Sequence, residues 1–591
     1  MRKNPRLTFS GSTREEDSWL SNEELRQCRR ADEAEPLRSP VPTRHVSNGE
    51  YMPLPQSDAQ RRVEARVGEI ADEASSRLNM SRRQFLAGTG GLAASFLAMN
   101  QVHGQFFDVS ENELYEHGRG HGTSRGAPSN LFVFDDQLHV VRGSASGAGF
   151  ALRAIAQGPT TPGFDMNPFN PEGFPDENGD VWGVWNPDLV GSDLTPAEFE
   201  LVQWVQDVYL DSQVTIGLLS NVTAFSVVAP TGEERPGRSV EEARPFEILT
   251  AEQTAAVRDF INDIAGSRRC MAHGLLYTGP GNLHFIQEQI DLYGPDSWKG
   301  YNISFAAKMD NDPDSFMQQW RLDQEDAAYP TYELISANYA QQRKEHPGQN
   351  TICVHKGLVA EATPPDPKLG HPGDIPKAAT DWPNLNFVIY HSCIKPSFFM
   401  GEALKDLMSG RHRDGVPDIE WTTEFAQLAA PFPNVYAELG TTWASMIVTF
   451  PTVAAHVMGQ LLKYLGPNRI IFGSDSPWYG SPQWQIDALW RFQIPESLQR
   501  AYGYPALTNG AKRKILGLNA ARLYKVPGAA ESSDKGKYRP VPADYESRIP
   551  DELKTLLEFE GFTADNFARM REAYVSRGIQ RRDTRYGWIR A

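Results

Sequence analysis

The chain has 591 residues, enough for one large domain with extensions or for two or three domains. Hydrophobic residues make up 40% of it and aromatic residues 10%, which supports a sizeable core and a largely globular chain. The formal net charge of −17 argues against general binding to nucleic acids or anionic membranes.

The first 80 residues differ in composition from the rest. Arg, Glu, Asp, Ser and Pro dominate residues 1–80, and large apolar residues are scarce, so we expect a polar extension that is largely disordered or loosely attached. Within it, residues 57–79 place Val63, Val67 and Ile70 at helical spacing, which predicts a helix.

Residues 81–105 resemble a twin-arginine export signal. Ser81 precedes Arg82 and Arg83, and a modest apolar run follows from Phe85 to Met99. This run is too short to span a bilayer comfortably. The resemblance predicts export to the periplasm by the twin-arginine machinery, with cleavage left open. The alternative is a basic-headed amphipathic helix packed on the domain of a cytoplasmic protein.

From residue 131 the chain alternates between strand-like and helical segments. The helical pattern is clear, for example, in residues 195–212 and 250–264. The strand-like segments are residues 131–141, 213–220, 269–277, 298–305, 350–357, 386–392, 434–440 and 469–475. Strands separated by helices pair in parallel, so we predict an α/β fold, a closed (β/α)8 TIM barrel over residues 106–526. A doubly wound open sheet is the alternative, but no GxGxxG follows the first strand. We expect residues 527–591 to form a helical tail.

The first strand-like segment carries unusual polar groups. In a regular strand, Asp135, Gln137 and His139 would share one face, because side chains two apart point the same way. Three convergent polar groups are costly to bury unless they bind something.

Polar residues also end other strands of the predicted barrel. His139 closes the first strand, and His355, His391 and Asp475 end the fifth, sixth and eighth. Active sites of such barrels lie at the carboxyl ends of the strands. A single histidine there is more often a hydrogen-bonded rim residue. Three imidazoles and a carboxylate together indicate a divalent-metal site.

Four motifs in this order resemble the amidohydrolase-related family (amidohydrolase family 2) of metal-dependent TIM barrels, which includes aminocarboxymuconate-semialdehyde decarboxylase-like proteins. They are FDDQLHVV, ICVHKGL, NFVIYHS and RIIFGSDSPW, and KRKILGLNAARLYKV at residues 512–526 is similar to the last helix of that family. The resemblance covers residues 131–526. It implies that His139, His355, His391 and Asp475 occupy the metal and catalytic positions.

Gln137 departs from the family pattern. The family usually has D-x-H-x-H on the first strand, whereas this chain has a glutamine at the first histidine position, and an amide is a weak neutral ligand. One possibility is that a single metal is held by His139, His355, His391 and Asp475, with Gln137 at the edge of the site. The other is that the site prefers a different metal. Asp135 would then orient a ligand.

The resemblance implies one divalent cofactor, Zn²⁺, with Mn²⁺ or Fe²⁺ as alternatives. Metal-activated water would attack a C–N or C–O bond of a small substrate, with Asp475 moving the proton and His391 stabilising the oxyanion. The first alternative is a non-oxidative decarboxylase or hydratase on the same barrel. The second is a non-catalytic degenerate barrel that serves as a subunit or binding module.

Several further residues have two interpretations each. Lys299 would be a carbamylated metal-bridging lysine, as in the wider superfamily, or a rim lysine paired with an acid. His273 would contact substrate or lie in the core or rim, and Glu438 would face the pocket or hold an arginine. Of the four cysteines, none of which forms a CxxC pair, Cys353 and Cys393 should fill barrel layers.

Long insertions follow several strands on the catalytic side. Residues 158–189, 361–375 and 476–485 combine Pro and Gly with aromatic residues, which predicts a lid over an aromatic or apolar substrate or, alternatively, packed connectors. We expect a small-molecule substrate, aromatic or carboxylated, no nucleic acid, and a homo-oligomer.

Overall fold

The computed structural model describes twelve stretches of the chain. They are residues 39–43, 56–115, 126–142, 200–221, 227–228, 234–235, 247–302, 320–357, 369–395, 407, 409–526 and 538–557. The predicted insertion at 158–189 and the first part of 361–375 lie outside these residues, as do residues 1–38.

Eight strands form one parallel sheet in the order β1-β2-β5-β6-β7-β8-β11-β12. They are β1 Phe134–Leu138, β2 Ile216–Leu219, β5 Cys270–Leu275, β6 Ser297–Tyr301, β7 Thr351–His355, β8 Asn386–Tyr390, β11 Val435–Glu438 and β12 Ile470–Ile471. The ring closes because Asp136 N–H donates to Phe472 O (3.0 Å) and Leu138 bridges Ser476 in parallel. The prediction of a (β/α)8 barrel is confirmed.

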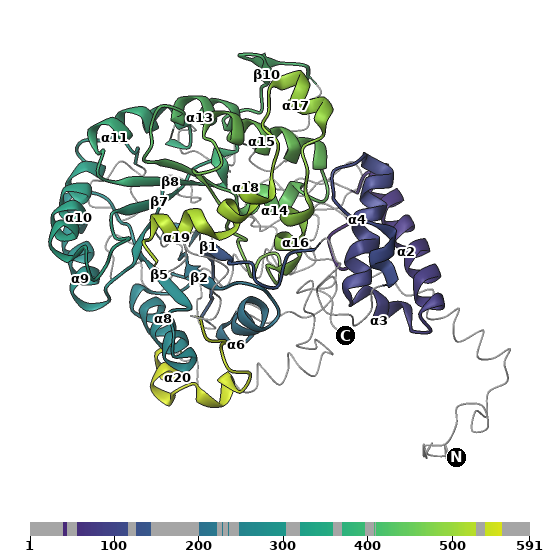
Figure 1. The fold of residues 1–591 in the computed structure, drawn as a ribbon. Coiled ribbons are helices and arrows are strands. Elements are labelled where there is room, and N and C mark those ends of the chain that lie inside the picture. Colours follow the sequence, from purple (N-terminus) through teal and green to yellow (C-terminus); the bar gives the residue numbers. More distant parts are fainter. Residues whose placement is uncertain are drawn as a thin grey trace. The chain divides into compact units, whose positions relative to one another are not determined.

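Helices surround these strands (Figure 1). The α-helices of the barrel and tail are α6 Leu201–Val205, α8 Ala251–Ala265, α9 Leu283–Leu292, α10 Ala328–Gln342, α11 Ile375–Asp381, α13 Thr422–Ala429, α14 Gly440–Met446, α15 Pro451–Tyr464, α16 Gln483–Arg491, α17 Glu496–Tyr502, α18 Asn509–Arg513, α19 Asn519–Leu523 and α20 Asp551–Leu557. The local sequence sets their limits. In α8, for example, Thr250 and Gln253 form a capping box, and Gly266 in the left-handed region (φ 58°) ends the helix.

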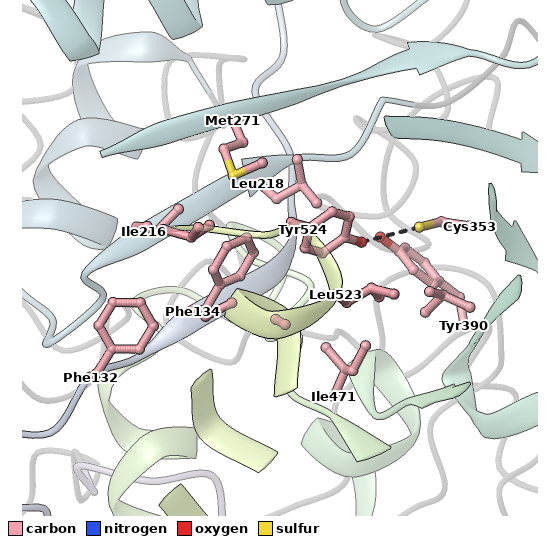
Figure 2. Packing of buried hydrophobic residues seen from close by; sticks show 14 residues of the cluster. Phe132, Phe134, Ile216, Leu218, Met271, Cys353, Tyr390, Ile471, Leu523 and Tyr524 are labelled. Carbon is pink, nitrogen blue, oxygen red and sulfur yellow. Dashed lines mark hydrogen bonds between the residues drawn. The ribbon is translucent and has the colours of Figure 1, made fainter. Parts of the chain in front are cut away.

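The lower barrel interior is filled by apolar side chains from several strands and from the C-terminal segment that contains α19 (Figure 2). Tyr524 lies between Phe134 and Tyr390 in this view, and its ring stacks on Phe134 with centroids 5.4 Å apart. Its hydroxyl is 3.4 Å from the sulfur of Cys353, which fills the core as expected. This floor leaves the polar strand ends above it as the place for chemistry.

A helical layer precedes the barrel: α2 Asp58–Arg77, α3 Arg82–Leu86, α4 Thr89–His103 and the short η1 Glu111–Tyr115. The helix predicted at 57–79 is confirmed, and Val63, Val67 and Ile70 are buried. This helix is the part of residues 1–80 that the apolar spacing set apart from the loosely attached extension, and its apolar stripe packs against α4, which is itself mostly buried.

Specific contacts join this layer to α16 of the barrel. Arg491 and Glu113 form an ion pair at 2.7 Å with both side chains only 3% exposed, and Phe107 meets Phe492 edge to face. The segment that resembles an export signal forms α3 and α4, and export stays a prediction. None of the helices in the described ranges is long and apolar enough to cross a membrane.

Candidate active site

The backbone of β1 determines how its polar side chains are arranged. Asp135 pairs with Gly217 and Leu138 with Leu219, so β1 advances three residues while β2 advances two. Such a bulge interrupts the regular alternation of faces from which the prediction that Asp135, Gln137 and His139 share one face was made. Asp135 Oδ1 instead accepts hydrogen bonds from the main-chain N–H groups of Ser474 (2.9 Å) and Gln137 (3.3 Å).

His139 and Asp475 form a buried pair. The distance from His139 Nε2 to Asp475 Oδ1 is 2.9 Å, and both side chains are 2% exposed. Burial raises the pKa of Asp475, but the hydrogen bond from His139 and the neighbouring imidazoles outweigh burial and hold this pKa below its ordinary value. The carboxylate is therefore ionised and accepts the Nε2 proton of His139, which leaves the lone pair on Nδ1.

The surroundings fix this pair in place. His139 N–H donates to Ser476 O (2.7 Å) and Asp475 N–H donates to Gln137 O (3.0 Å), so main-chain bonds hold both residues. The ring of Trp478 lies 5.4 Å from that of His139 and provides an aromatic wall. Within the described ranges, His139 Nδ1 is buried and has no hydrogen-bond partner.

His391 is held as a neutral imidazole. The main-chain N–H of Thr441 donates to His391 Nδ1 at 3.1 Å, so this nitrogen carries no proton. Burial lowers the pKa of His391 to about 3, and the proton of the neutral ring therefore sits on Nε2. Nε2 is 3.5 Å from the amide nitrogen of Gln137, and a rotation of this amide by half a turn would bring its oxygen to accept the Nε2 proton.

The backbone at both reactive residues is strained. Residues 391–393 have φ angles of 58°, 50° and 54°, and Asp475 has a φ of 59°. Non-glycine residues in this left-handed region cost of order 1–3 kcal/mol each and are concentrated at functional sites. The coincidence of strain with the strand-end His391 and Asp475 supports a site here independently of the sequence pattern.

The end of β11 holds the strained segment. Glu438 Oε2 accepts the main-chain N–H of His391 at 3.0 Å, and Thr442 Oγ1 donates to His391 O at 2.6 Å. Burial raises the pKa of Glu438 well above its ordinary value. Glu438 therefore positions His391. The described contacts of Glu438 do not include the arginine that the sequence analysis considered as a partner.

His355 completes the group at the end of β7. Its ring lies 4.6 Å from the ring of His391 and stacks on Tyr301, also at 4.6 Å. Burial lowers the pKa of His355 well below its ordinary value. The structure thus brings His139, His355, His391 and Asp475 together, with Gln137 beside them.

The geometry of the cluster bears on the predicted metal ligands. A catalytic zinc centre usually takes three protein ligands. His139 Nε2 and Asp475 Oδ1 are close enough to share one ion. No set of three His, Cys, Asp or Glu side chains in the described part of the chain is arranged to hold a metal, however. Gln137 supplies only an amide, and His391 Nδ1 already accepts the Thr441 N–H. The described side chains do not form the expected ligand set, and the metal site stays a prediction.

Lys299 and His273 lie inside the barrel. Lys299 is fully buried in the middle of β6, with Nζ 3.4 Å from the ring centroid of Tyr390, so it is not the strand-end lysine expected from sequence. His273 Nε2 is 3.0 Å from Tyr390 Oη, and its Nδ1 is 2.8 Å from Ser297 Oγ. These contacts make His273 part of a buried network beneath the strand ends.

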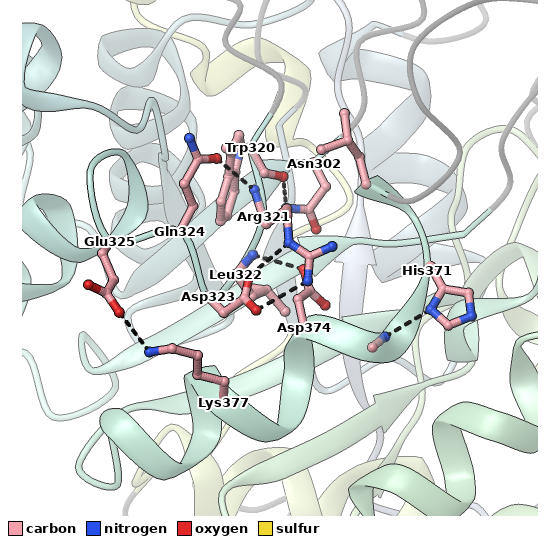
Figure 3. Close-up of polar contacts among 12 residues, drawn as sticks. Asn302, Trp320, Arg321, Leu322, Asp323, Gln324, Glu325, His371, Asp374 and Lys377 are labelled. Carbon is pink, nitrogen blue, oxygen red and sulfur yellow. Dashed lines mark hydrogen bonds and ion pairs between the residues drawn. The ribbon is translucent and has the colours of Figure 1, made fainter.

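Polar contacts also join the described ends of the loops after β6 and β7 (Figure 3). Asp374 accepts the N–H of Leu322 at 2.9 Å and forms a buried ion pair at 2.9 Å with Lys356, the residue after His355. His371, which the sequence does not place, accepts the N–H of Gly373 through Nδ1 at 3.1 Å. The buried pair anchors the carboxyl end of β7, where His355 lies.

Sequence analysis did not identify Thr441 or Tyr479. Thr441 touches both His391 and Asp475, and Tyr479 Oη donates to Thr441 Oγ1 at 3.1 Å. A signal existed, because Thr441 follows the carboxyl end of β11 at the rim where the other polar residues meet.

Residues 315–526 match the sequence model of a family described as amidohydrolase. No curated protein sequence matches the chain.

Among solved structures, the chain is similar to an uncharacterised TIM-barrel protein from Bordetella bronchiseptica, with 15% identity over 67% of this chain and 99% of that one, at a TM-score of 0.36. An amidohydrolase from Burkholderia multivorans with bound zinc has 14% identity over 67% and 100% of the two chains, at a TM-score of 0.31. A dihydroxybenzoic acid decarboxylase from Polaromonas, with bound manganese and the inhibitor 2-nitroresorcinol, has 12% identity over 67% and 97%, at a TM-score of 0.31.

Proposed function

We propose, from the match of residues 315–526 to the amidohydrolase family model and from the site described above, that the barrel is an enzyme that hydrolyses a C–N or C–O bond of a small organic substrate. One observation carries the proposal: the buried pair of His139 and Asp475 beside the neutral imidazole of His391. Two of these three residues are on strained backbone, which supports a catalytic rather than a purely structural arrangement.

His139 acts as the general base in this proposal. The ionised Asp475 holds its Nε2 proton, so Nδ1 takes a proton from the attacking water, and the carboxylate stabilises the imidazolium that forms. When the tetrahedral intermediate collapses, the same Nδ1 proton passes to the leaving nitrogen or oxygen. The proton count therefore closes without any further group.

His391 supplies the hydrogen bond to the substrate oxygen. Because Thr441 N–H occupies Nδ1, the Nε2–H of His391 is the only donor of its ring, and it faces the polar cluster near Gln137. A fixed donor gains strength as a carbonyl oxygen becomes an oxyanion. Trp478 beside His139 gives the substrate an aromatic wall, which favours an aromatic or unsaturated substrate.

Non-oxidative decarboxylation is the second candidate. It replaces a carboxylate by a proton, and the protonated form of the His139–Asp475 pair would deliver this proton to carbon. The same Nε2–H of His391 would bind an oxygen of the acid. Both reactions thus use one site. Hydrolysis starts from neutral His139, and decarboxylation starts from protonated His139.

The test compares an ester, a lactone and an aromatic acid: p-nitrophenyl acetate, dihydrocoumarin and 2,6-dihydroxybenzoate. We expect hydrolysis of the first two and its loss in His139→Gln, which keeps a donor for Asp475 but has no base. Release of CO2 from the acid alone would favour the decarboxylase. Turnover of none of them, by wild type or variant alike, would favour the non-catalytic barrel.

Metal content tests the cofactor directly. After incubation with Zn²⁺ or Mn²⁺ and gel filtration, we expect retention on the order of a tenth of an equivalent or less, and activity that a chelator does not change. Retention of a full equivalent, with activity lost to the chelator, would replace this proposal by metal-activated water on His139, His355 and Asp475.

A further inference from the structure

We infer that Thr441 is a positioning residue that sets the proton on His391 and the orientation of the Asp475 carboxylate at the same time. The inference rests on the proposed function, because it assigns Thr441 a role in the chemistry of these two residues. The family resemblance does not name this residue.

Three hydrogen bonds meet at Thr441. Its main-chain N–H donates to His391 Nδ1 at 3.1 Å, and its hydroxyl donates to Asp475 Oδ2. Tyr479 Oη donates to the same hydroxyl at 3.1 Å. All four residues are buried. A threonine hydroxyl has one proton, and the ionised carboxylate accepts it, so the direction of the chain from Tyr479 through Thr441 to Asp475 is fixed.

The backbone brings Thr441 close enough because Gly440 precedes it. Gly440 has a φ of 37°, and a Cβ there would lie 2.5 Å from Gln137 Oε1 and 2.7 Å from His391 Nδ1. No other residue type fits this gap without displacing one of these two side chains. The glycine therefore permits the approach, and Thr441 makes the contacts.

The two contacts of Thr441 have different consequences. The N–H fixes the His391 tautomer, and any residue except proline at this position would retain it. The hydroxyl occupies Asp475 Oδ2, so that Oδ1 is directed to His139 Nε2 at 2.9 Å. Without the hydroxyl, the carboxylate would lose the bond that directs Oδ1 to His139, and the tautomer of this base would be less firmly set.

The experiment compares Thr441→Val, which keeps size and N–H, with Thr441→Ser, which keeps the hydroxyl. With p-nitrophenyl acetate we expect Thr441→Val to lower kcat by about tenfold to a hundredfold with KM within about twofold, because the bond acts on the proton transfer. Thr441→Ser should recover most of the lost kcat. Tyr479→Phe, which removes the donor to Thr441, should fall between the two.

The matched control is Thr331→Val in α10. Thr331 is buried like Thr441, and its hydroxyl has no hydrogen-bond partner among the residues that the structure describes, so this variant should keep kcat. A second readout does not use turnover. In protein labelled with ¹⁵N-histidine, the Nε2 proton signal of His139, assigned with His139→Gln, should shift in Thr441→Val and return in Thr441→Ser.

A Thr441→Val variant with wild-type kcat and an unchanged His139 signal overturns the inference, as does a Thr441→Ser variant as slow as Thr441→Val. Failure of the proposed function is a separate result, because Asp475→Asn would then also leave turnover unchanged. If Thr441→Val does not fold, a Tyr479→Phe variant equal to wild type in kcat and in the His139 signal overturns the inference.

Discussion

Asp475 combines a strained backbone with a carboxylate that accepts bonds from His139 and Thr441. Asparagine in Asp475→Asn has nearly the same size as aspartate, but its amide has one acceptor oxygen and no charge, so it cannot accept the hydrogen bonds of both His139 and Thr441. We expect the fold to persist and kcat to fall by about 10²-fold or more. Steady-state kinetics with a thermal melt check this, and Asp381→Asn on the exposed side of α11 is the control. Unchanged kcat in Asp475→Asn would remove this residue from the mechanism.

Gln137 separates this chain from the family pattern, and its substitution tests the metal question at one residue. Gln137→His would add an imidazole beside His391 and near the His139–Asp475 pair. We expect Zn²⁺ retention to rise from traces toward one equivalent, because a third strong ligand becomes available. Gln137→Ala should retain no more metal than wild type. The amide of Gln137 would itself be a ligand if the wild-type protein bound Zn²⁺ tightly and Gln137→Ala bound it at least tenfold more weakly.

The residues of the site could be predicted in part. Parallel strands place their carboxyl ends on one rim, so the convergence of His139, His355, His391 and Asp475 follows from strand ends alone. The bulge in β1 does not follow, because one extra residue in a pairing depends on contacts with the partner strand. The rim position of Thr441 after β11 could have been read from the strand-end pattern, but its bonds to His391 and Asp475 could not, because they depend on how three segments of the chain meet.

At the scale of elements, a buried ion pair joins the helical layer of α2, α3, α4 and η1 to α16. Glu113→Gln would leave Arg491 buried without a counter-charge, so we expect a loss of about 3–5 kcal/mol in the free energy of unfolding. Urea unfolding measures it. Glu69→Gln breaks the exposed pair with Arg66 and should change the free energy by less than about 1 kcal/mol. Equal effects of the two variants would mean that the layer does not depend on this pair.

The fate of α4 tests the export prediction. Because most of α4 is buried, including Leu92, Phe96 and Met99, removal of residues 81–103 would expose the apolar surface against which it packs. We expect the mature protein to retain these residues, as intact-mass measurement of protein from its native cell fractions would show. A mature chain that begins after His103 in the periplasmic fraction would support a cleaved export signal instead. Replacement of Arg82 and Arg83 by lysine tests whether the paired arginines direct location.

The elements themselves were predictable where a periodic pattern is strong. The helix at 57–79 has a continuous apolar stripe, and α8 has a capping box and a terminal glycine. The packing of the N-terminal layer was not predictable, because the apolar stripe of α2 indicates that it needs a partner and does not indicate which segment supplies it.

At the scale of the whole molecule, buried neutral histidines should make the protein sensitive to acid. Burial lowers the pKa of His456 to about 4, and its Nδ1 is 3.0 Å from Tyr504 Oη. The folded protein binds a proton at His456 less readily than the unfolded chain does. The contribution of His456 to the free energy of unfolding is therefore fully present above the unfolded pKa of 6.5 and is lost as the pH falls toward the folded pKa of about 4. For His456 this is at most about 3 kcal/mol.

His456→Gln lies away from the strand-end cluster and isolates this effect. The variant should lose less stability than wild type between pH 7 and pH 4.5, measured as the free energy of unfolding in urea at each pH. Parallel curves for the two proteins would contradict the assignment.

The ring of strands has a consequence for how activity arises in time. His139 and Asp475 are 336 positions apart, and main-chain bonds across the junction of the first and last strands hold them together. A ribosome adds Asp475 long after His139, so a nascent chain that ends before residue 475 contains the base without its carboxylate. We therefore expect turnover to return during refolding only when the ring of strands closes, so that the rate of recovery of activity measures the rate of this closure.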